Sequence, residues 1–470
     1  MSEYSVVIIG SGPAGYTCAV RLAQLGASVA IVERDFIGGI CTNWGCTPSK
    51  SMIESAKVAR IVKDSAKYGI NVTDVAIDFR QVAARRDDVI RHARQEVVHL
   101  LEHYGVGIYQ GEAEIVEPGR VKVRLGKLDL DGEIMHYDGP EEEIEADHIV
   151  LATGSQPLMP DFVDRDDPSV VSSNRLISIG VLPETLTIVG GGVIGLEFAT
   201  IFSNLGSQVT IVEFLDRVLA GMDPDISAEI TRQMTNHGVR VLTSHEVVAV
   251  QHGVLQAKNR ISQAMLEIES QAILIAIGRR AVTNAALYNR LELEFTPKGI
   301  GANDFLQTNV PGIWAIGDAT GKSILAHVGM QQGIVCAENI MKGPRAFRRM
   351  DYEVIPSVVY SIPEVAGIGT VPADLTGVGV YKVPFVINLR ARIEAFDDGF
   401  VKIWIRDNNV IAAQAIGHNV SEIMQELANM IALKTPLDDV AGIIHAHPTY
   451  SEITRSILEY ALGKATDFIQ

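Results

Sequence analysis

A glycine-rich unit occurs twice in this chain of 470 residues, at a spacing of 180 residues. Each copy has the pattern of a strand, a tight glycine turn, a helix and a second strand, and Val6–Asp35 matches Leu186–Asp216. The repeat predicts that one α/β unit is used twice. Five residues of the first copy coincide with five of the second: Gly10, Gly12, Gly15, Gly26 and Glu33 with Gly190, Gly192, Gly195, Gly206 and Glu213.

The spacing of these glycines is typical of dinucleotide-binding turns. The first glycine lets the chain turn sharply off the strand, the second leaves room for a pyrophosphate, and the third lets helix and strand pack closely. The helix N-terminus then faces the anion, and the acid that ends the second strand accepts hydrogen bonds from a ribose. A single turn of this kind also occurs without a ligand, but two copies in the same context favour dinucleotide binding at both.

The two acids that follow the glycine turns are predicted to hold one ribose each. They are Glu33 and Glu213. Glu213 favours NAD over NADP, because a carboxylate there would repel the extra phosphate. Arg217 could meet that phosphate, but a lone arginine more often lies in solvent or in a surface ion pair.

The composition of the chain excludes several classes of partner. A net charge of -17 argues against nucleic acid, because nucleic-acid binding needs concentrated Lys and Arg. The N-terminus lacks the basic region and cleavage site of a secretory signal, and no apolar run approaches the roughly 20 residues that cross a bilayer. We therefore predict a soluble, cytoplasmic protein without a nucleic-acid or membrane partner.

The remaining sequence indicates how the domains are arranged. Short apolar runs that end in glycine at Ile149–Gly154, Ile273–Gly278 and Ile313–Asp318 are typical of buried strands that stop at a ligand crevice. Phe79–Tyr104 has helical spacing, and from Tyr352 onward no nucleotide motif occurs. We predict an α/β protein with two Rossmann-like domains and an α+β C-terminal dimerisation domain. The predicted divisions are 1–152 with 277–345 for FAD and a central domain, 153–276 for NAD, and 346–470 for the interface.

Two of the four cysteines lie close together, at Cys41 and Cys46, after the first repeat. Residues five apart in an undistorted helix rise about 7.5 Å, which exceeds the usual Cα separation of a disulfide. A bond between them requires a local bend, which Gly45 would permit, and a strained bridge is easily reduced. A metal pair or two unrelated core thiols are the alternatives, and Cys18 and Cys336 are predicted to be inert core residues.

Four segments together resemble the pyridine nucleotide-disulfide oxidoreductases, and within that family most closely the dihydrolipoamide dehydrogenases. The resemblance spans essentially the whole chain. The segments are Gly39–Lys50, the twin glycine motifs, Ala315–Asp318 and His445–Glu452.

The glycine turns and the resemblance together assign two sets of cofactor-binding residues. The FAD set is Gly10, Gly12, Gly15, Glu33, Thr42, Lys50, Ala113, Thr153, Gly154, Ser155, Asp318, Ile324, Leu325, Ala326 and His327. The NAD set is Gly190, Gly192, Val193, Ile194, Gly195, Glu197, Glu213, Val247 and Gly278.

The resemblance also implies the catalytic roles. Cys41 would form a mixed disulfide with substrate, Cys46 would be released as a thiolate against the flavin, and Lys50 would pair with Glu197 beside it.

His447, oriented by Glu452, would be the acid/base, delivered from the partner subunit of a homodimer. His445 and His447 could instead form part of a metal site, but the missing third ligand and Glu452 favour acid/base chemistry, so we predict no metal. Pro448 allows a cis peptide that could aim the imidazole.

The implied reaction is oxidation of a protein-bound dihydrolipoyl group with NAD as acceptor. Reduction of another disulfide or of mercuric ion is an alternative, and a redox-sensing or structural flavoprotein subunit is an alternative of a different class. Departures from the pattern at Val328, at Thr370–Leu375 and in the short segment before Phe385 are compatible with a specialised lipoyl protein as partner.

Overall fold

The first of three main sheets contains the first glycine repeat. The computed structural model describes residues 2–128 and 135–469. Parallel strands lie in the order β3-β2-β1-β7-β20, and β4 pairs antiparallel with β3 and β7. The central strands β1 and β2 and the end of β7 have consecutive buried residues, as expected for strands covered on both faces, which explains their Val and Ile runs. Their bounds are β1 (Ser2–Ile9), β2 (Val29–Glu33), β3 (Gly107–Glu117), β4 (Arg120–Leu125), β7 (Glu141–Leu151) and β20 (Ile313–Ala315).

The second sheet repeats the topology of the first. Its five strands are all parallel, in the order β12-β11-β10-β16-β9. The register is repeated too: Val6 pairs with Val29, and Leu186 pairs with Val209. The predicted internal duplication is therefore confirmed. The bounds are β9 (Val170–Val171), β10 (Thr185–Val189), β11 (Gln208–Val212), β12 (Arg240–Leu242) and β16 (Ala272–Ile275).

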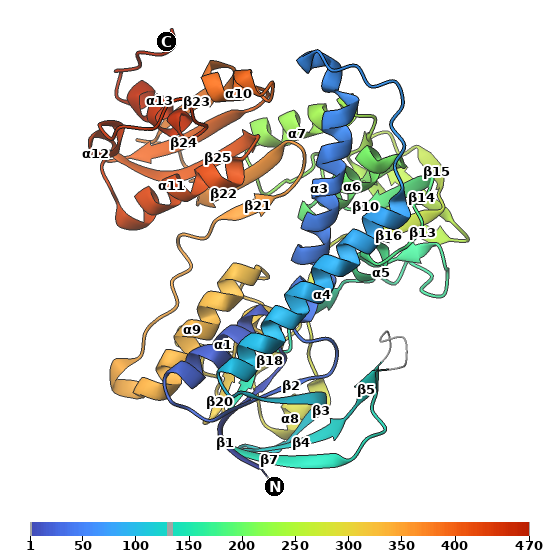
Figure 1. The fold of residues 1–470 in the computed structure, drawn as a ribbon, viewed down its shortest axis with the longest axis vertical. Coiled ribbons are helices and arrows are strands. Elements are labelled where there is room, and N and C mark those ends of the chain that lie inside the picture. The colour runs from blue at the N-terminus through green and yellow to red at the C-terminus, as the bar shows by residue number, and fades with distance from the viewer. Residues whose placement is uncertain (1, 129–134, 470) are drawn as a thin grey trace.

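Five helices lie beside the carboxyl ends of the strands in the first two sheets. The turns after β1 and β10 lead into α1 (Pro13–Gln24) and α6 (Val193–Leu205). Helix α9 (Ala326–Lys342) packs along α1. Helix α4 (Phe79–His103) extends from the first sheet toward the second, and α3 (Cys46–Lys63) packs against α4 and α6 (Figure 1). Met52 and Ile53 of α3 share a buried core with the second sheet. The predicted helix Phe79–Tyr104 differs from α4 by one terminal residue.

The C-terminal sheet is antiparallel, in the order β21-β22-β25-β24-β23. Helix α11 (Val420–Leu433) and helix α13 (Glu452–Ala461) pack against it and share its apolar core. Strands β24 and β25 form a hairpin around Asp407–Asn409. The bounds are β21 (Ser357–Val359), β22 (Glu364–Gly369), β23 (Gly379–Pro384), β24 (Phe400–Arg406) and β25 (Asn409–Gly417).

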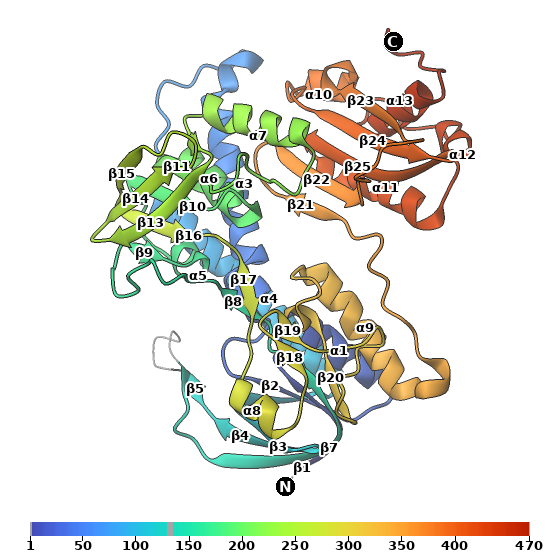
Figure 2. The ribbon, with the colours of Figure 1, turned by 180° about the vertical axis from the view of Figure 1, so that it is seen from behind.

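Smaller elements connect these units. Strands β8 (Ser155–Pro157) and β17 (Arg279–Ala281) pair where the chain crosses between the first and second sheets (Figure 2). Within the described residues, no helix combines the length and apolar character needed to cross a bilayer. The other elements are α2 (Gly39–Asn43), α5 (Ser173–Ile177), α7 (Pro224–Asn236), α8 (Ala285–Arg290), α10 (Leu389–Ile393), α12 (Leu437–Ala441), β5 (Lys127–Leu128), β6 (Met135–His136), β13 (His245–Gln251), β14 (Val254–Asn259), β15 (Met265–Glu269), β18 (Phe295–Thr296) and β19 (Gly299–Ile300).

A buried arginine joins α4 to the end of α5, the helix that packs against the second sheet. Arg86 is 3% exposed. Its guanidinium donates to the carbonyls of Ile177 at 2.6 Å and of Ile179 at 2.9 Å, at the end of α5. Carbonyls at a helix C-terminus have no partner within the helix, so this side chain supplies one from another part of the chain.

Arg86→Met is expected to destabilise the protein by about 2–3 kcal/mol, because buried carbonyls lose a charged donor. Thermal unfolding followed by circular dichroism measures the loss as a lower midpoint. Arg91→Met is the matched control, because Arg91 lies on the same helix but is exposed and pairs with exposed Asp88. Equal midpoints for the two variants would contradict the proposed contribution of Arg86.

Candidate active site

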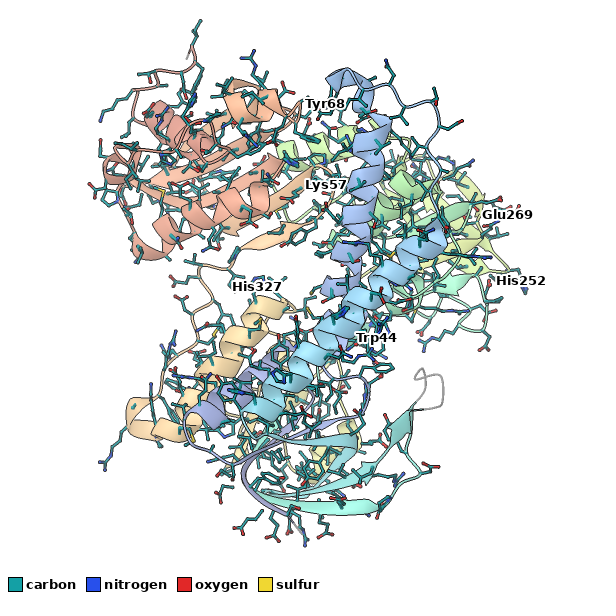
Figure 3. The ribbon with its side chains drawn as sticks, in the orientation of Figure 1. Trp44, Lys57, Tyr68, His252, Glu269 and His327 are labelled. Atoms are coloured by element: carbon teal, nitrogen blue, oxygen red, sulfur yellow. The ribbon has the colours of Figure 1, made fainter. Side chains whose placement is uncertain are left out.

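A cavity of about 800 Å³ opens at the carboxyl ends of the first sheet. It runs from the first glycine turn past both cysteines to Lys50 and Glu197, and residues of the C-terminal sheet close one end. Ligands of open α/β sheets bind at this edge. Figure 3 marks Trp44, from the segment between the cysteines, and His327, at the beginning of α9; both line the cavity.

Both glycine turns have the geometry that their spacing predicts. Gly10 and Gly190 have φ of +105° and +108°, where side chains are rarely tolerated. A Cβ on Gly15 would come within 1.9 Å of the Gly10 carbonyl, so only glycine lets α1 pack this closely. A Cβ on Gly12 would meet nothing within 4 Å, because the start of α1 faces open space. The equivalent Gly192 is equally open.

The two acids that follow the turns are held in matching positions. Glu33 Oε2 accepts from the Ser11 amide at 2.8 Å, and Oε1 accepts from the Asp35 amide at 2.8 Å. Glu213 repeats this pattern with Gly191 and Leu215, at 2.5 and 2.7 Å. Backbone donors thus fix each carboxylate at the wall of a cavity, where a ribose hydroxyl could donate to it.

Most residues assigned to FAD lie on this cavity wall. Asp318 accepts a hydrogen bond from Ser155 at 2.5 Å, and burial raises the pKa of Asp318. Gly15 and Thr42 lie behind the wall, since both are packed against other parts of the protein. The assigned residues on the wall are Gly10, Gly12, Glu33, Lys50, Ala113, Thr153, Gly154, Ser155, Asp318, Ile324, Leu325, Ala326 and His327.

The residues assigned to NAD divide between two places. Val193, Ile194 and Glu197 line the first cavity. A second cavity, of about 470 Å³, lies beside the second glycine turn and is lined by Gly192, Val193 and Glu213. Gly190, Gly195 and Gly278 line neither cavity, although Gly190 and Gly195 shape the turn beside the second. Val247 lies in the apolar core between β13 and the second sheet, and its side chain reaches neither cavity.

The two cysteines stand on either side of a helix break. Helix α2 ends at Asn43 and α3 begins at Cys46, so the predicted local bend is present. A Cβ on Gly45 would come within 3.1 Å of the Ile40 carbonyl, which shows how tightly the chain folds back. Both cysteines are free thiols here, and both line the first cavity.

The thiols differ in acidity because of their neighbours. The hydrogen bond from Cys41 lowers the pKa of Cys46 to about 7, while burial opposes the shift and Lys50 adds to it. The same hydrogen bond and burial raise the pKa of Cys41. Lys50 Nζ donates to both oxygens of Glu197 at 2.9 Å, and it lies 4.5 Å from the centre of the Tyr360 ring. Cys46 is therefore the better leaving thiolate.

In the reduced protein, the thiolate absorbance of Cys46 is expected to rise with a midpoint near pH 7, because the thiol is protonated below its pKa. Lys50→Met should move the midpoint to higher pH, since it removes a positive charge and leaves Glu197 unpaired. Lys57→Met, on the same helix (Figure 3), should leave the midpoint unchanged. The measurement is an anaerobic ultraviolet titration, with the Cys46→Ser spectrum subtracted. A lower midpoint in Lys50→Met would contradict this account.

His447 lies in the C-terminal part of the chain, in the segment between α12 and α13. Its Nδ1 is 2.9 Å from Glu452 Oε1, and Glu452 Oε2 accepts from the Thr449 amide at 2.8 Å. The His447 side chain is 65% exposed and does not line the cavity of its own chain. The peptide before Pro448 is cis, as the sequence allowed. His445 pairs with Glu426 instead, at 3.0 Å.

Sequence reasoning missed two polar groups near the cysteines. Arg279 is inside the cavity wall and donates to the Ser155 hydroxyl and carbonyl, both at 2.9 Å. Asn43 is 3% exposed; it donates to the Gly39 carbonyl at 2.8 Å and accepts from Arg94 at 2.8 Å. A buried asparagine between two cysteines was the available signal for the second group.

The residues that line the first cavity fit FAD. The unblocked start of α1 can face a pyrophosphate, Glu33 can receive a ribose, and the far end reaches the cysteines and Lys50. Two thiols in a cavity that also contains a dinucleotide-binding glycine turn and its acid are typical of a dinucleotide-dependent disulfide oxidoreductase.

Comparison with known proteins supports the same class of oxidoreductase. The family model described as pyridine nucleotide-disulphide oxidoreductase matches residues 4–333, and the model of its dimerisation domain matches residues 355–457. The chain belongs to the pyridine nucleotide-disulphide oxidoreductase family. The cofactors of this family are FAD and NAD, the two that the sequence predicts.

Several relatives match over nearly their whole length. The dihydrolipoyl dehydrogenase of Chlamydia pneumoniae is 34% identical, with 96% of this chain and 95% of the relative covered. That of Geobacillus stearothermophilus is also 34% identical, with 98% and 97% covered. Among solved structures, the Cu(II) complex of the HOCl-induced flavoprotein disulfide reductase RclA from Escherichia coli has a TM-score of 0.86 at 25% identity, with 98% and 100% covered.

Proposed function

We propose that this protein is a dihydrolipoyl dehydrogenase, which oxidises a protein-bound dihydrolipoyl group and reduces NAD. The observation that carries the proposal is the pair of thiols, Cys41 and Cys46, on either side of a helix break in the wall of the cavity that also contains the first glycine turn, Lys50 and Glu197. Relatives from several organisms that carry this name support the choice of substrate.

The chemistry begins at the cysteine disulfide. His447 accepts the proton of one substrate thiol, and the resulting thiolate attacks Cys41 sulfur. The Cys41–Cys46 bond breaks, a mixed disulfide forms, and Cys46 leaves as a thiolate beside Lys50. The second substrate thiol then gives its proton to Cys41 and attacks the substrate sulfur of the mixed disulfide, which releases the oxidised cyclic substrate and Cys41 as a thiol.

Bound FAD supplies the two-electron chemistry that links the cysteine dithiol to NAD. The residues that would hold it are Glu33 with the first glycine turn, Asp318, and Lys50 with Glu197 near the thiols. Glu197 also accepts from the Tyr360 amide at 3.1 Å, which fixes the carboxylate that holds Lys50.

A homodimer supplies the base in this proposal. His447 is exposed and outside the cavity of its own chain, so it would act on the cysteines of the partner chain. The match to a dimerisation domain at residues 355–457 supports a dimer. The three sheets support domains at 1–152 with 277–345, 153–276 and 346–470, and we infer a cytoplasmic location.

A second candidate is reduction of a metal ion or another disulfide. It is favoured by the likeness to the RclA structure, which is described as a Cu(II) complex. The cysteine pair would then be reduced by NADH through FAD, and the oxidised substrate would accept electrons from the thiols.

A substrate panel distinguishes these candidates. The purified yellow protein is assayed with dihydrolipoamide and NAD, and with NADH or NADPH against lipoamide, glutathione disulfide, Cu(II) and mercuric ion. The proposal predicts the highest kcat/KM for the dihydrolipoamide–NAD pair. Preference for glutathione disulfide or a metal ion would favour the second candidate, and bound FAD without turnover on any substrate would favour a redox-sensing or structural role.

A further inference from the structure

The loop after β11 joins the second glycine turn to the C-terminal sheet. It starts at Glu213 and ends at Asp223, the N-cap of α7. Within it, the Leu219 amide donates to the Gly191 carbonyl at 3.0 Å, so the loop and the glycine turn hold each other. A change in the position of this loop would therefore also move the turn.

The second cavity lies between this loop and the C-terminal sheet. One wall consists of the glycine turn with Glu213 and Arg217. The opposite wall consists of Ser357, Gly367–Gly369 and Gln414, on strands β21, β22 and β25. The width of the cavity therefore depends on how the loop is fixed to that sheet.

A largely buried ion cluster makes this connection. Lys402 Nζ, on β24, donates to both oxygens of Asp223 at 2.9 Å and to Asp225 at 3.2 Å. The side chains of Lys402 and Asp223 are only 14% and 10% exposed. Burial alone would lower the pKa of Lys402, but its hydrogen bonds to the two aspartates raise it above the ordinary value. Lys402 is therefore charged at neutral pH, and its largely buried contact with Asp223 is only weakly screened by salt.

A neutral contact reinforces the same end of the loop. Gln414 accepts a hydrogen bond from the Asp223 amide at 2.8 Å, and Gln414 also lines the second cavity. The side chain of Met222 packs close to Gly367, where an added Cβ would lie 3.3 Å from it. The end of the loop is thus held by charge, hydrogen bond and packing at one place.

We propose that Lys402 is a positioning residue for nicotinamide nucleotide binding: it fixes the loop that carries Glu213 to the C-terminal sheet and so sets the shape of the second cavity. This inference rests on the proposed placement of NAD beside Glu213. Lys402 itself does not line either cavity. Its effect is expected on nucleotide affinity and not on the chemical step.

The test measures NAD binding by calorimetry and steady-state kinetics with the dimeric holoenzyme. Lys402→Met should raise both the Kd and the KM for NAD by about 3- to 30-fold, the usual range for coupling through packed contacts. The kcat and the FAD content should stay within twofold of wild type. Lys402→Arg, which keeps the charge, should recover most of the affinity.

Three further variants keep the test decisive. Lys464→Met removes an exposed ion pair with Asp438 and should change nothing. Asp223→Asn keeps a side-chain acceptor at the N-cap of α7 but removes the charge that pairs with Lys402, and Asp223 lines neither cavity, so this variant should weaken NAD binding even if Lys402→Met fails to fold. Glu213→Ala tests the site itself.

An unchanged Kd for NAD in both Lys402→Met and Asp223→Asn, with a weaker Kd in Glu213→Ala, would overturn the role of Lys402 alone. An unchanged Kd in all three would overturn the placement of NAD as well. A fall in kcat with KM unchanged in Lys402→Met would also contradict a positioning role.

Discussion

Cys41→Ser is expected to lower dihydrolipoamide oxidation by about 10⁴-fold or more, because no disulfide remains for the substrate thiolate to attack. Reduction of ferricyanide by NADH should continue at close to the wild-type rate, since that reaction needs only the nucleotide, the flavin and an acceptor. The measurement is a pair of steady-state assays on protein with matched FAD content.

Cys336→Ala is the matched control for this prediction. Cys336 is 0% exposed and packs between α9 and α1, away from the cavity. Both activities of this variant should stay within about twofold of wild type, although its stability should fall slightly. Loss of ferricyanide reduction in Cys41→Ser, or retention of dihydrolipoamide oxidation, would contradict the proposed chemistry.

His447→Gln is expected to slow dihydrolipoamide oxidation by about 10²- to 10⁴-fold, the usual contribution of a positioned base. Flavin reduction by NADH, followed in a stopped-flow instrument, should be unchanged. Glu452→Gln should cause a smaller loss. Burial opposes ionisation of Glu452, but its hydrogen bonds from Thr449 and His447 hold its pKa below the ordinary value, so wild-type Glu452 is an anion that orients the imidazole.

Mixed dimers test whether His447 acts across the subunit interface. Cys41→Ser and His447→Gln subunits are each inactive as homodimers, but a heterodimer would contain one site with an intact cysteine pair and an intact base. Random mixing of subunits should restore roughly a quarter of wild-type activity, because half of the dimers are mixed and each has one working site. No recovery after mixing would show that the base acts within its own chain.

The fold was predictable because its signals are local. The turns at Gly10 and Gly190 need a positive φ, which favours glycine. The apolar runs before these turns are typical of buried strands. The duplication then determined the second sheet from the first, down to the register of Val6 and Leu186. Local patterns of this kind can be recognised in the sequence without knowledge of tertiary contacts.

The site was predictable only in part. The bend between Cys41 and Cys46 followed from the glycine between them, but the pairing of Lys50 with Glu197, 147 residues apart, was implied by family resemblance alone. Val247 was assigned to NAD, yet its side chain packs in the core. The contacts of Arg86 and Lys402 had no sequence signal, because each depends on how separate units pack together.

A thiol count tests the central claim most directly. The protein as purified in air is denatured with and without prior anaerobic reduction by one equivalent of NADH per FAD, and its free thiols are counted. The chain has four cysteines, and a redox-active Cys41–Cys46 pair predicts two free thiols before reduction, Cys18 and Cys336, and four after it. Four free thiols in both samples, with the flavin alone reduced, would contradict the account.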